Sequence, residues 1–135
     1  GDEIVETVLL IKDTRGYIFG ALAMRPWAET SRYYGLGEGM VFKCGPAGMR
    51  SSQSSALGTL GQFQRFGWSR KNSMFQTATK DALGLGGGGA GYALWLDGNL
   101  RSGTSMPCDT YNNTCLASSS KFEVAEIELW GLQLA

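Results

Sequence analysis

The sequence predicts a mainly β protein, a two-sheet antiparallel β-sandwich with a few short helices. Segments with continuous or alternating apolar residues recur along the chain, separated by turn-forming residues at intervals of about eight to twelve positions. Patterns with the helical period are scarce, and Lys80–Leu85 has room for one turn at most. Glycine supplies 20 of the 135 residues, about twice its usual share, which is typical of a turn-rich β protein.

The N-terminal part predicts an antiparallel hairpin. Its strands are Glu6–Lys12, which contains a buried apolar run, and Tyr17–Ala23. The segment from Asp13 to Gly16 favours a compact turn, because an aspartate side chain accepts hydrogen bonds from nearby amides and glycine tolerates positive φ. Pro26 ends the hairpin because proline has no amide hydrogen to donate.

Loops and short strands alternate through the middle of the chain. Ala28–Gly39 is expected to be an irregular loop, and Met40–Cys44 a short strand. The Ser- and Gly-rich stretch Gly45–Gly61 is expected to be a surface excursion. Gln62–Trp68 and Ser73–Thr79 have the pattern of two further strands, and the tight connection between them predicts a second hairpin.

A glycine run before an apolar strand is the most distinctive stretch. Six of the eight residues from Gly84 to Gly91 are glycine, which indicates a corner or a close crossing of backbones. Tyr92–Leu96 follows as a strand with apolar residues on both faces, as in a central strand. Asp97-Gly98-Asn99 supplies a turn, and Leu100 starts the return strand. The predicted structural residues of the corner are Gly86, Gly87, Gly88 and Gly89.

The same run contains a literal dinucleotide-binding motif that its context does not support. Gly84, Gly86 and Gly89 match GxGxxG, in which a glycine turn delivers a pyrophosphate to a helix N-terminus. Here a strand-like run follows in place of a helix, and no acidic residue lies in a βαβ unit about twenty positions further on. We therefore expect no nucleotide and no other cofactor.

The C-terminal part predicts a polar loop and a last strand. Ser102–Ser120 is mostly polar, and Phe122–Leu132 alternates apolar and acidic residues. The apolar phase of this strand shifts after Val124, which predicts a β-bulge near Ala125 and Glu126.

Charge and composition argue against several classes of function. Twelve basic and twelve acidic residues give no net charge to attract nucleic acid or anionic lipid. No apolar run approaches the roughly 18 residues of a membrane-spanning helix, so membrane insertion is not expected. Histidine is absent, and the three cysteines lack CxxC spacing, so the sequence predicts neither a metal site nor a histidine-based catalytic triad.

The remaining candidate chemistry is sparse. The carboxylates lie in turns or on the predicted solvent face of a strand, so no catalytic residue is assigned, and an enzymatic role is not expected. Cys108 is the candidate redox residue because its loop position permits exposure, although a buried small hydrophobe is the simpler interpretation. Cys44 is expected in the core, as are the four tryptophans, Trp27, Trp68, Trp95 and Trp130.

Five segments together resemble one known family. In chain order they are LLIKDTRGYIFGALA, YYGLGEG, FGWSRKNSMF, ALGLGGGGAGYALWLDGNLRSGTS and CDTYNNTCLASSSKFEVAEIELWGL, and they are similar to the TLDc domain of the oxidation-resistance protein family. The resemblance covers nearly the whole chain, so residues 1–135 are interpreted as a single TLDc-like domain. Family members usually carry a further N-terminal strand and helix, which this chain is expected to lack, and a shorter segment in place of Gly45–Gly61.

The resemblance implies a role in protection from oxidative damage. Several such eukaryotic proteins bind the vacuolar-type proton-pumping ATPase and regulate its assembly, and no agreed active-site residues accompany the family. We therefore expect a cytoplasmic, non-catalytic interaction module whose partners are soluble-sector subunits of that pump, which recruit it to lysosomal or vacuolar membranes. The alternative is a weak thiol-dependent antioxidant centred on Cys108.

Candidate docking residues are chosen at two polar turns. Arg70 and Lys71 occupy one turn, and Asp97 and Asn99 occupy the other. Such turns tolerate change without disturbing a core, and they often carry recognition.

Overall fold

The computed structural model describes residues 4–46 and 63–133. Strands account for the regular structure, and no helix is present in these two ranges, so the expected short helices are not found there. Lys80–Leu85, which had room for a helical turn, instead contains a strand. The strands are β1 (Ile4–Asp13), β2 (Tyr17–Ala23), β3 (Met40–Pro46), β4 (Gln64–Gly67), β5 (Gln76–Thr79), β6 (Ala82–Leu85), β7 (Leu94–Asp97), β8 (Ser102–Thr104) and β9 (Lys121–Gln133).

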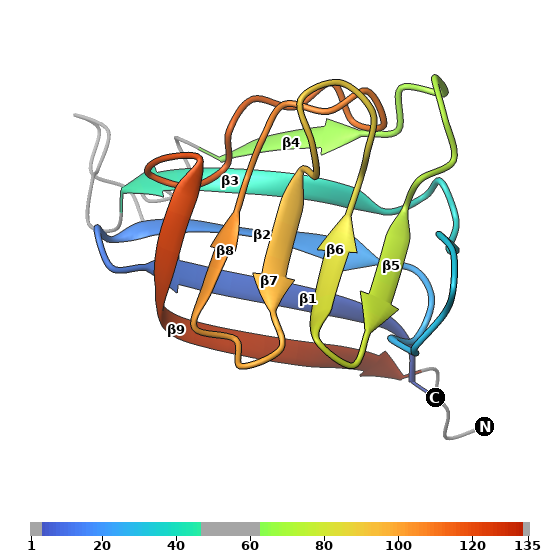
Figure 1. Cartoon of the computed structure of the whole chain (residues 1–135), viewed down its shortest axis with the longest axis horizontal. Helices are drawn as coiled ribbons and strands as arrows, with labels where there is room; N and C mark the ends of the chain where they lie inside the picture. The colour runs from blue at the N-terminus through green and yellow to red at the C-terminus, as the bar shows by residue number, and fades with distance from the viewer. Residues whose placement is uncertain (1–3, 47–62, 134–135) are drawn as a thin grey trace.

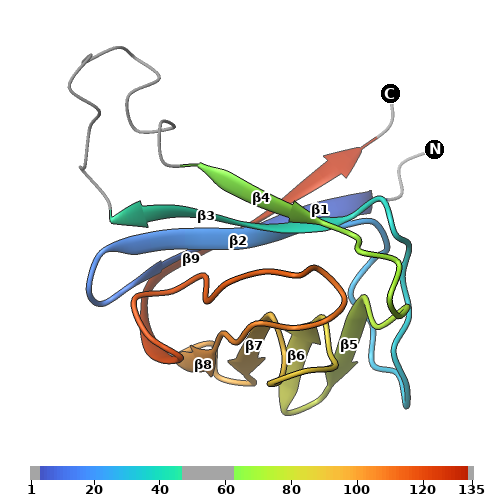
Figure 2. The same ribbon diagram turned by 90° about the horizontal axis from the view of Figure 1, so that it is seen from above.

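Strand pairing joins the described strands into one antiparallel sheet. Their order is β4-β3-β2-β1-β9-β8-β7-β6-β5, so the expected pair of separate sheets is not what the hydrogen bonding gives. The reason is β9, whose first residues pair with β8 while the rest of the strand pairs with β1. Figure 2 shows the consequence, in which the part of the sheet holding β5 to β8 lies across from the part holding β1 to β4.

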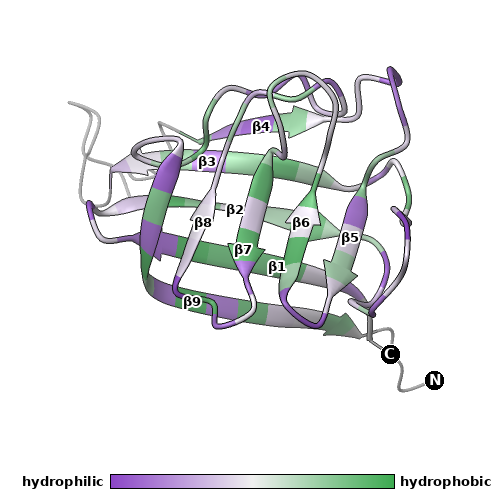
Figure 3. Cartoon of the chain, in the orientation of Figure 1, coloured by the Kyte–Doolittle hydropathy of each residue, from purple (hydrophilic) through white to green (hydrophobic). Residues whose placement is uncertain are grey.

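A β-bulge marks the place where β9 changes partners. Lys12 is opposite Glu126 and Asp13 is opposite Val124, which leaves Ala125 as an extra residue in β9. This confirms the bulge predicted from the phase of the apolar pattern. Because a bulge bends a strand and increases its twist, it helps β9 to leave β1 and reach β8. The alternation of polar and apolar residues along β9 is visible in Figure 3.

The first hairpin is as predicted. β1 and β2 pair antiparallel from Thr7 to Lys12, and Gly16 in the turn has φ of +89°. The buried Asp13 carboxylate accepts the backbone N–H groups of Arg15 at 3.0 Å and Tyr17 at 2.9 Å. It also accepts the N–H of Ser118 at 2.9 Å, so the same side chain shapes the turn and anchors a distant loop.

The second hairpin prediction is wrong. β4 pairs with β3 at one edge of the sheet and β5 pairs with β6 at the other, so the two predicted strands exist without pairing to each other. Their connection is shaped by Trp68, whose indole N–H donates to the Asn72 carbonyl at 2.7 Å and whose ring packs edge-on against Phe75. Most of the Gly45–Gly61 stretch lies outside the described residues.

The core fills the space between the two parts of the sheet. Phe19 from β2 and Phe122 from β9 meet at 4.9 Å in an edge-to-face arrangement, and β7 contributes Leu94 and Leu96, both fully buried. β7 lies between β6 and β8, which confirms its prediction as a central strand. The return strand begins at Ser102, because Leu100 has φ of +57° and belongs to the turn.

Several core predictions are corrected. Trp130 is 60% exposed, because it lies with Glu128 on the face of β9 that turns away from the core. Trp27 and Trp68 are half-buried and pack at the edge of the core, whereas Trp95 is half-buried on the outer face of β7. Cys44 is also half-buried rather than fully enclosed.

Candidate interaction site

The glycine corner, Gly86–Gly89, connects β6 to β7 and packs against the loop after β8 (Figure 1). Gly86, Gly88 and Gly89 have φ of +80°, +76° and +73°, a region that favours glycine. A Cβ added at Gly86 would lie 2.7 Å from the Cys108 sulfur, closer than real side-chain contacts. Position 86 therefore requires glycine, both because of its backbone conformation and because the Cys108 sulfur leaves no room for a side chain.

Thr110 and Asn72 hold the corner in place. The Thr110 hydroxyl oxygen accepts the Gly87 N–H at 2.9 Å, and the hydroxyl donates to Asn72 Oδ1 at 2.6 Å. The Asn72 side-chain amide donates to the Gly87 carbonyl at 3.2 Å. This network ties together three segments that are distant in sequence, so it also fixes the turn that carries Arg70 and Lys71.

Arg70 and Lys71 are exposed on this fixed turn. Arg70 adopts φ of +70°, and its guanidinium lies 4.9 Å from the centre of the Trp68 ring. Lys71 Nζ donates to Asn112 Oδ1 at 3.0 Å. Both cations are thus held by neighbouring side chains, which lowers the entropy lost when they contact a partner.

Cys108, the candidate redox residue, lies beneath the corner. It is 4% exposed, and its thiol donates to Asn113 Oδ1 at 3.2 Å. The side-chain amide of Asn113 donates in turn to the carbonyls of Met106 and Thr114, each at 2.9 Å. A thiol that scavenges oxidants must be accessible to them and must be present partly as the thiolate. The Cys108 thiol is instead buried and serves as a hydrogen-bond donor.

The tyrosines around the corner are not poised for acid–base chemistry near neutral pH. Burial raises the pKa of Tyr111, and the nearby Cys108 adds to the increase. Burial also raises the pKa of Tyr33, with a further contribution from Tyr92, while the Tyr33 hydroxyl donates to the Gly86 carbonyl at 2.9 Å. These hydroxyls therefore stay protonated near neutral pH, and that of Tyr33 serves as a hydrogen-bond donor.

Asp97 and Asn99 lie at the opposite end of the β6 and β7 strands. Asp97 is opposite Ala82 at the start of β6, whereas the glycine corner follows the end of that strand (Figure 1). The Asp97 carboxylate accepts the Arg101 N–H at 3.0 Å and the Ser102 hydroxyl at 2.8 Å, and these hydrogen bonds lower its pKa. The two candidate docking turns are therefore not brought together.

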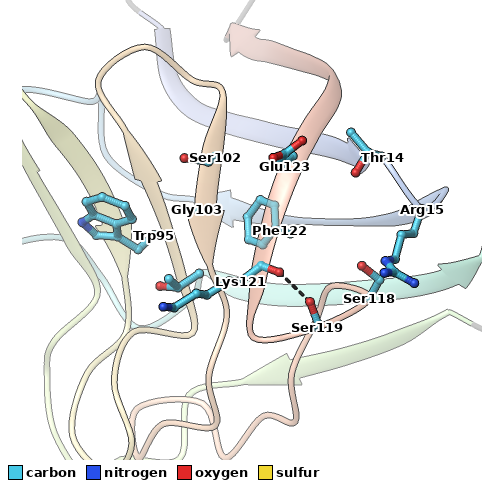
Figure 4. A pocket seen from close by; sticks show the side chains of 11 residues that line it. Thr14, Arg15, Trp95, Ser102, Gly103, Ser118, Ser119, Lys121, Phe122 and Glu123 are labelled. Atoms are coloured by element: carbon cyan, nitrogen blue, oxygen red, sulfur yellow. Dashed lines mark hydrogen bonds between the residues drawn. The ribbon is translucent and has the colours of Figure 1, made fainter.

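A polar trough of about 610 Å³ lies on the outer face of β7, β8 and β9. Trp95 faces outward because its neighbours Leu94 and Leu96 are buried, and Lys121 and Glu123 flank the buried Phe122 in the same way. Figure 4 shows Trp95 and Arg15 at opposite sides of the trough. Hydroxyl groups complete its lining, from Thr14, Ser102, Thr104, Ser118 and Ser119.

The trough was not predicted from sequence. Its residues come from the first turn, three strands and a late loop, so no local spacing connects them. The single available signal was Trp95, which alternates with buried leucines on a strand predicted to be central. Chemically, the trough offers hydroxyls, an indole and mixed charge, which suits contact with a polar surface.

The described residues contain neither a cluster of metal-binding side chains nor a helix that could cross a membrane. Over residues 4–46 and 63–133, no three Cys, Asp or Glu side chains converge into a metal-binding group. In the same ranges no helix is long and apolar enough to cross a membrane.

The fold and these surfaces define a small antiparallel β domain with a glycine corner and polar loop ends. The chain belongs to the TLDc domain family, whose model, described as "TLDc domain", matches residues 2–133. It is 36% identical over 126 residues to Oxidation resistance protein 1 of Homo sapiens and of Rattus norvegicus. It is 37% identical over 123 residues to Nuclear receptor coactivator 7 of Homo sapiens.

The chain corresponds to a small part of these relatives. The two alignments with Oxidation resistance protein 1 cover 93% of this chain and 13% of each relative. The alignment with Nuclear receptor coactivator 7 covers 91% of this chain and 12% of the relative.

Proposed function

We propose that this TLDc domain contributes to oxidation resistance as a non-catalytic interaction module that binds the vacuolar-type proton-pumping ATPase and regulates its assembly. Membership of the family and similarity to oxidation resistance proteins support the protective role. The proposed mode of action rests on one observation: the Cys108 thiol is buried, while the nearby cations of Arg70 and Lys71 are exposed on a fixed turn. That arrangement favours contact over thiol chemistry.

The module acts in the cytoplasm and reaches lysosomal or vacuolar membranes through the soluble-sector subunits of the pump. A binder shifts an assembly equilibrium only through its difference in affinity for the two states. The effect of the domain should therefore saturate at about one domain per pump.

A titration of reconstituted, nucleotide-supplied pump with purified domain tests this proposal. Assembly state and ATP hydrolysis are followed together as the domain is added. Saturation near equimolar domain supports it. Substoichiometric domain that disables many pumps in proportion to time would show turnover, and the interaction module would be rejected.

The alternative, a thiol-dependent antioxidant centred on Cys108, is separated by a cysteine-free variant. Replacing Cys44, Cys108 and Cys115 by serine keeps a hydroxyl donor opposite Asn113. We expect this variant to bind the pump as the unmodified domain does and to retain protection from peroxide. Loss of protection with intact pump binding would instead favour the antioxidant.

A further inference from the structure

The turn that carries Arg70 and Lys71 is followed by an exposed serine. Ser73 comes three residues after Arg70 and two after Lys71, and Met74 is the next residue. Ser73 is exposed and Met74 is 37% exposed, so both side chains reach the surface. They lie between β4 and β5 and belong to neither strand. Figure 1 shows this connection at the upper end of β5, whereas both ends of the chain lie at the lower right.

This order of side chains is the one that Arg-directed serine/threonine kinases recognise. Such kinases bind an arginine three residues before the acceptor hydroxyl, a second cation beside it and an apolar side chain directly after the acceptor, through acidic and apolar pockets that flank their active site. Arg70, Lys71 and Met74 supply these three features around Ser73.

Two other hydroxyls show why the position of Ser73 matters. Arg101 precedes Thr104 by the same three residues, but Thr104 is half-buried in β8, which is hydrogen-bonded to a strand on each side. Ser69 lies on the same turn as Arg70, but its hydroxyl donates to the Asp109 carbonyl. Among residues 4–46 and 63–133, no hydrogen bond engages the Ser73 hydroxyl. Ser73 therefore combines the basic spacing with an accessible acceptor.

We propose that Ser73 is a phosphorylation site for an Arg-directed kinase, and that its phosphate withdraws Arg70 and Lys71 from a partner. The Ser73 Oγ attacks the γ-phosphorus of ATP, and the new O–P bond replaces the bond from that phosphorus to the β–γ bridging oxygen. ADP leaves, and a base of the kinase takes the hydroxyl proton. The site assignment stands by itself, whereas the effect on the pump rests on the proposed function.

The present contacts of the two cations explain the effect of a phosphate. The Arg70 guanidinium lies over the Trp68 ring at 4.9 Å, and Lys71 Nζ donates to the neutral Asn112 amide oxygen at 3.0 Å. A phosphate on Ser73 adds about 1.5 to 2 negative charges at neutral pH. Its oxygens bind cations more strongly than an aromatic face or an amide oxygen does. The modified turn therefore carries almost no net charge, and its cations bind the phosphate.

Phosphorylation of the folded domain in vitro tests the site. The domain is incubated with an Arg-directed kinase and ATP, and mass spectrometry of its peptides locates the phosphate. We expect about one phosphate per chain, on Ser73, and none on this peptide in Ser73→Ala. Arg70→Gln should slow the reaction at least about tenfold. Arg101→Gln is the matched control, since Arg101 has the same spacing to Thr104, and it should change the rate less than about twofold.

Pull-down of soluble-sector pump subunits tests the effect on binding. The phosphorylated domain should bind about tenfold more weakly than the unmodified domain, and phosphatase treatment should restore binding. Ser73→Ala treated with the same kinase is the control and should bind as the unmodified domain does. If the unmodified domain itself fails to bind, the proposed function is rejected, while phosphate found on Ser73 still supports the site.

Several outcomes would overturn the proposal. The site is rejected if the folded domain takes up no phosphate, if Ser73 is modified only in urea, or if Thr104 is the main acceptor. Equal slowing by Arg70→Gln and Arg101→Gln would also reject it, once thermal unfolding has shown that both variants are folded. Equal pump binding by the phosphorylated and unmodified domains would reject the withdrawal of the cations.

Discussion

Gly86 and Cys108 pack so closely that the Cys108 sulfur occupies the space that a side chain at position 86 would need. A Cβ at Gly86 would approach the thiol to 2.7 Å, and Gly86 also has φ of +80°. Gly86→Ala should therefore lower the free energy of unfolding by about 1–3 kcal/mol. Urea unfolding measures the change. Combining it with Cys108→Ala should recover part of the loss, and full additivity would show that the contact is not the cause.

Gly88 tests the corner at a more exposed position. Its φ is +76°, and an added Cβ would lie 3.0 Å from both Asn72 Nδ2 and Asp109 Oδ2. Gly88→Val should cost at least about 1–3 kcal/mol, because a β-branched residue is strained at positive φ. Gly67→Val is the control, since a Cβ there meets nothing within 4 Å. A Gly88→Val domain that unfolds like the parent but loses a partner would make the corner a binding site.

Asp13 should contribute more to the free energy of unfolding than the exposed Asp81 does. Its buried carboxylate accepts backbone N–H groups from Arg15, Tyr17 and Ser118. Asp13→Ala leaves these donors without their acceptor, so we expect a loss of about 2–4 kcal/mol in the free energy of unfolding. The exposed Asp81 provides a control, and Asp81→Ala should change stability by less than about 0.5 kcal/mol. Similar losses from both would contradict the anchoring role.

Asp97 should give a small acid-sensitive contribution to stability. The Arg101 N–H, followed by the Ser102 hydroxyl, lowers the pKa of its carboxyl in the folded chain. The contribution is therefore present above the ordinary carboxyl pKa of about 3.9 and is lost as pH falls through the lower folded pKa. Melting temperatures of the parent and Asp97→Asn should differ near pH 6 and converge toward pH 2. A gap that widens in acid would have the wrong sign.

The two candidate docking turns should not contribute equally to binding. They lie at opposite ends of β6 and β7, and the Asp97 carboxylate is already engaged by its own turn. Replacing Arg70 and Lys71 by alanine should weaken pump binding, whereas replacing Asp97 and Asn99 should leave it within about twofold. Pull-down of soluble-sector subunits measures both. Equal losses would require a partner that spans the molecule.

Cys108 should be the least reactive cysteine of the folded chain. It is buried and donates its thiol hydrogen to Asn113, whereas Cys44 and Cys115 are partly exposed. Alkylation followed by mass spectrometry should label Cys108 last in the native state and at an ordinary rate in denaturant. Rapid native labelling of Cys108 would return support to the antioxidant.

Local patterns predicted local structure well. The Asp13 to Gly16 turn and the bulge at Ala125 follow from turn chemistry and from the phase of alternation, which act within a few residues. The pairing of strands was harder to predict, because the alternation in Ser73–Thr79 shows which side chains share a face but not which strand lies alongside. The exposure of Trp130 was missed for a related reason: alternation along β9 does not show which of its two faces turns away from the core.

The shared strand β9 also determines when the fold is completed during synthesis. Among the described strands it alone is hydrogen-bonded to both β1 and β8, and it follows all the others in the chain. Until it emerges from the ribosome, β1 and β8 both keep open edges, and pairing them through β9 requires contacts between distant parts of the sequence. Such topologies fold slowly and expose aggregation-prone edges meanwhile. Nascent chains stalled before Lys121 should therefore depend on chaperones far more than chains in which the residues up to Gln133 have left the ribosome.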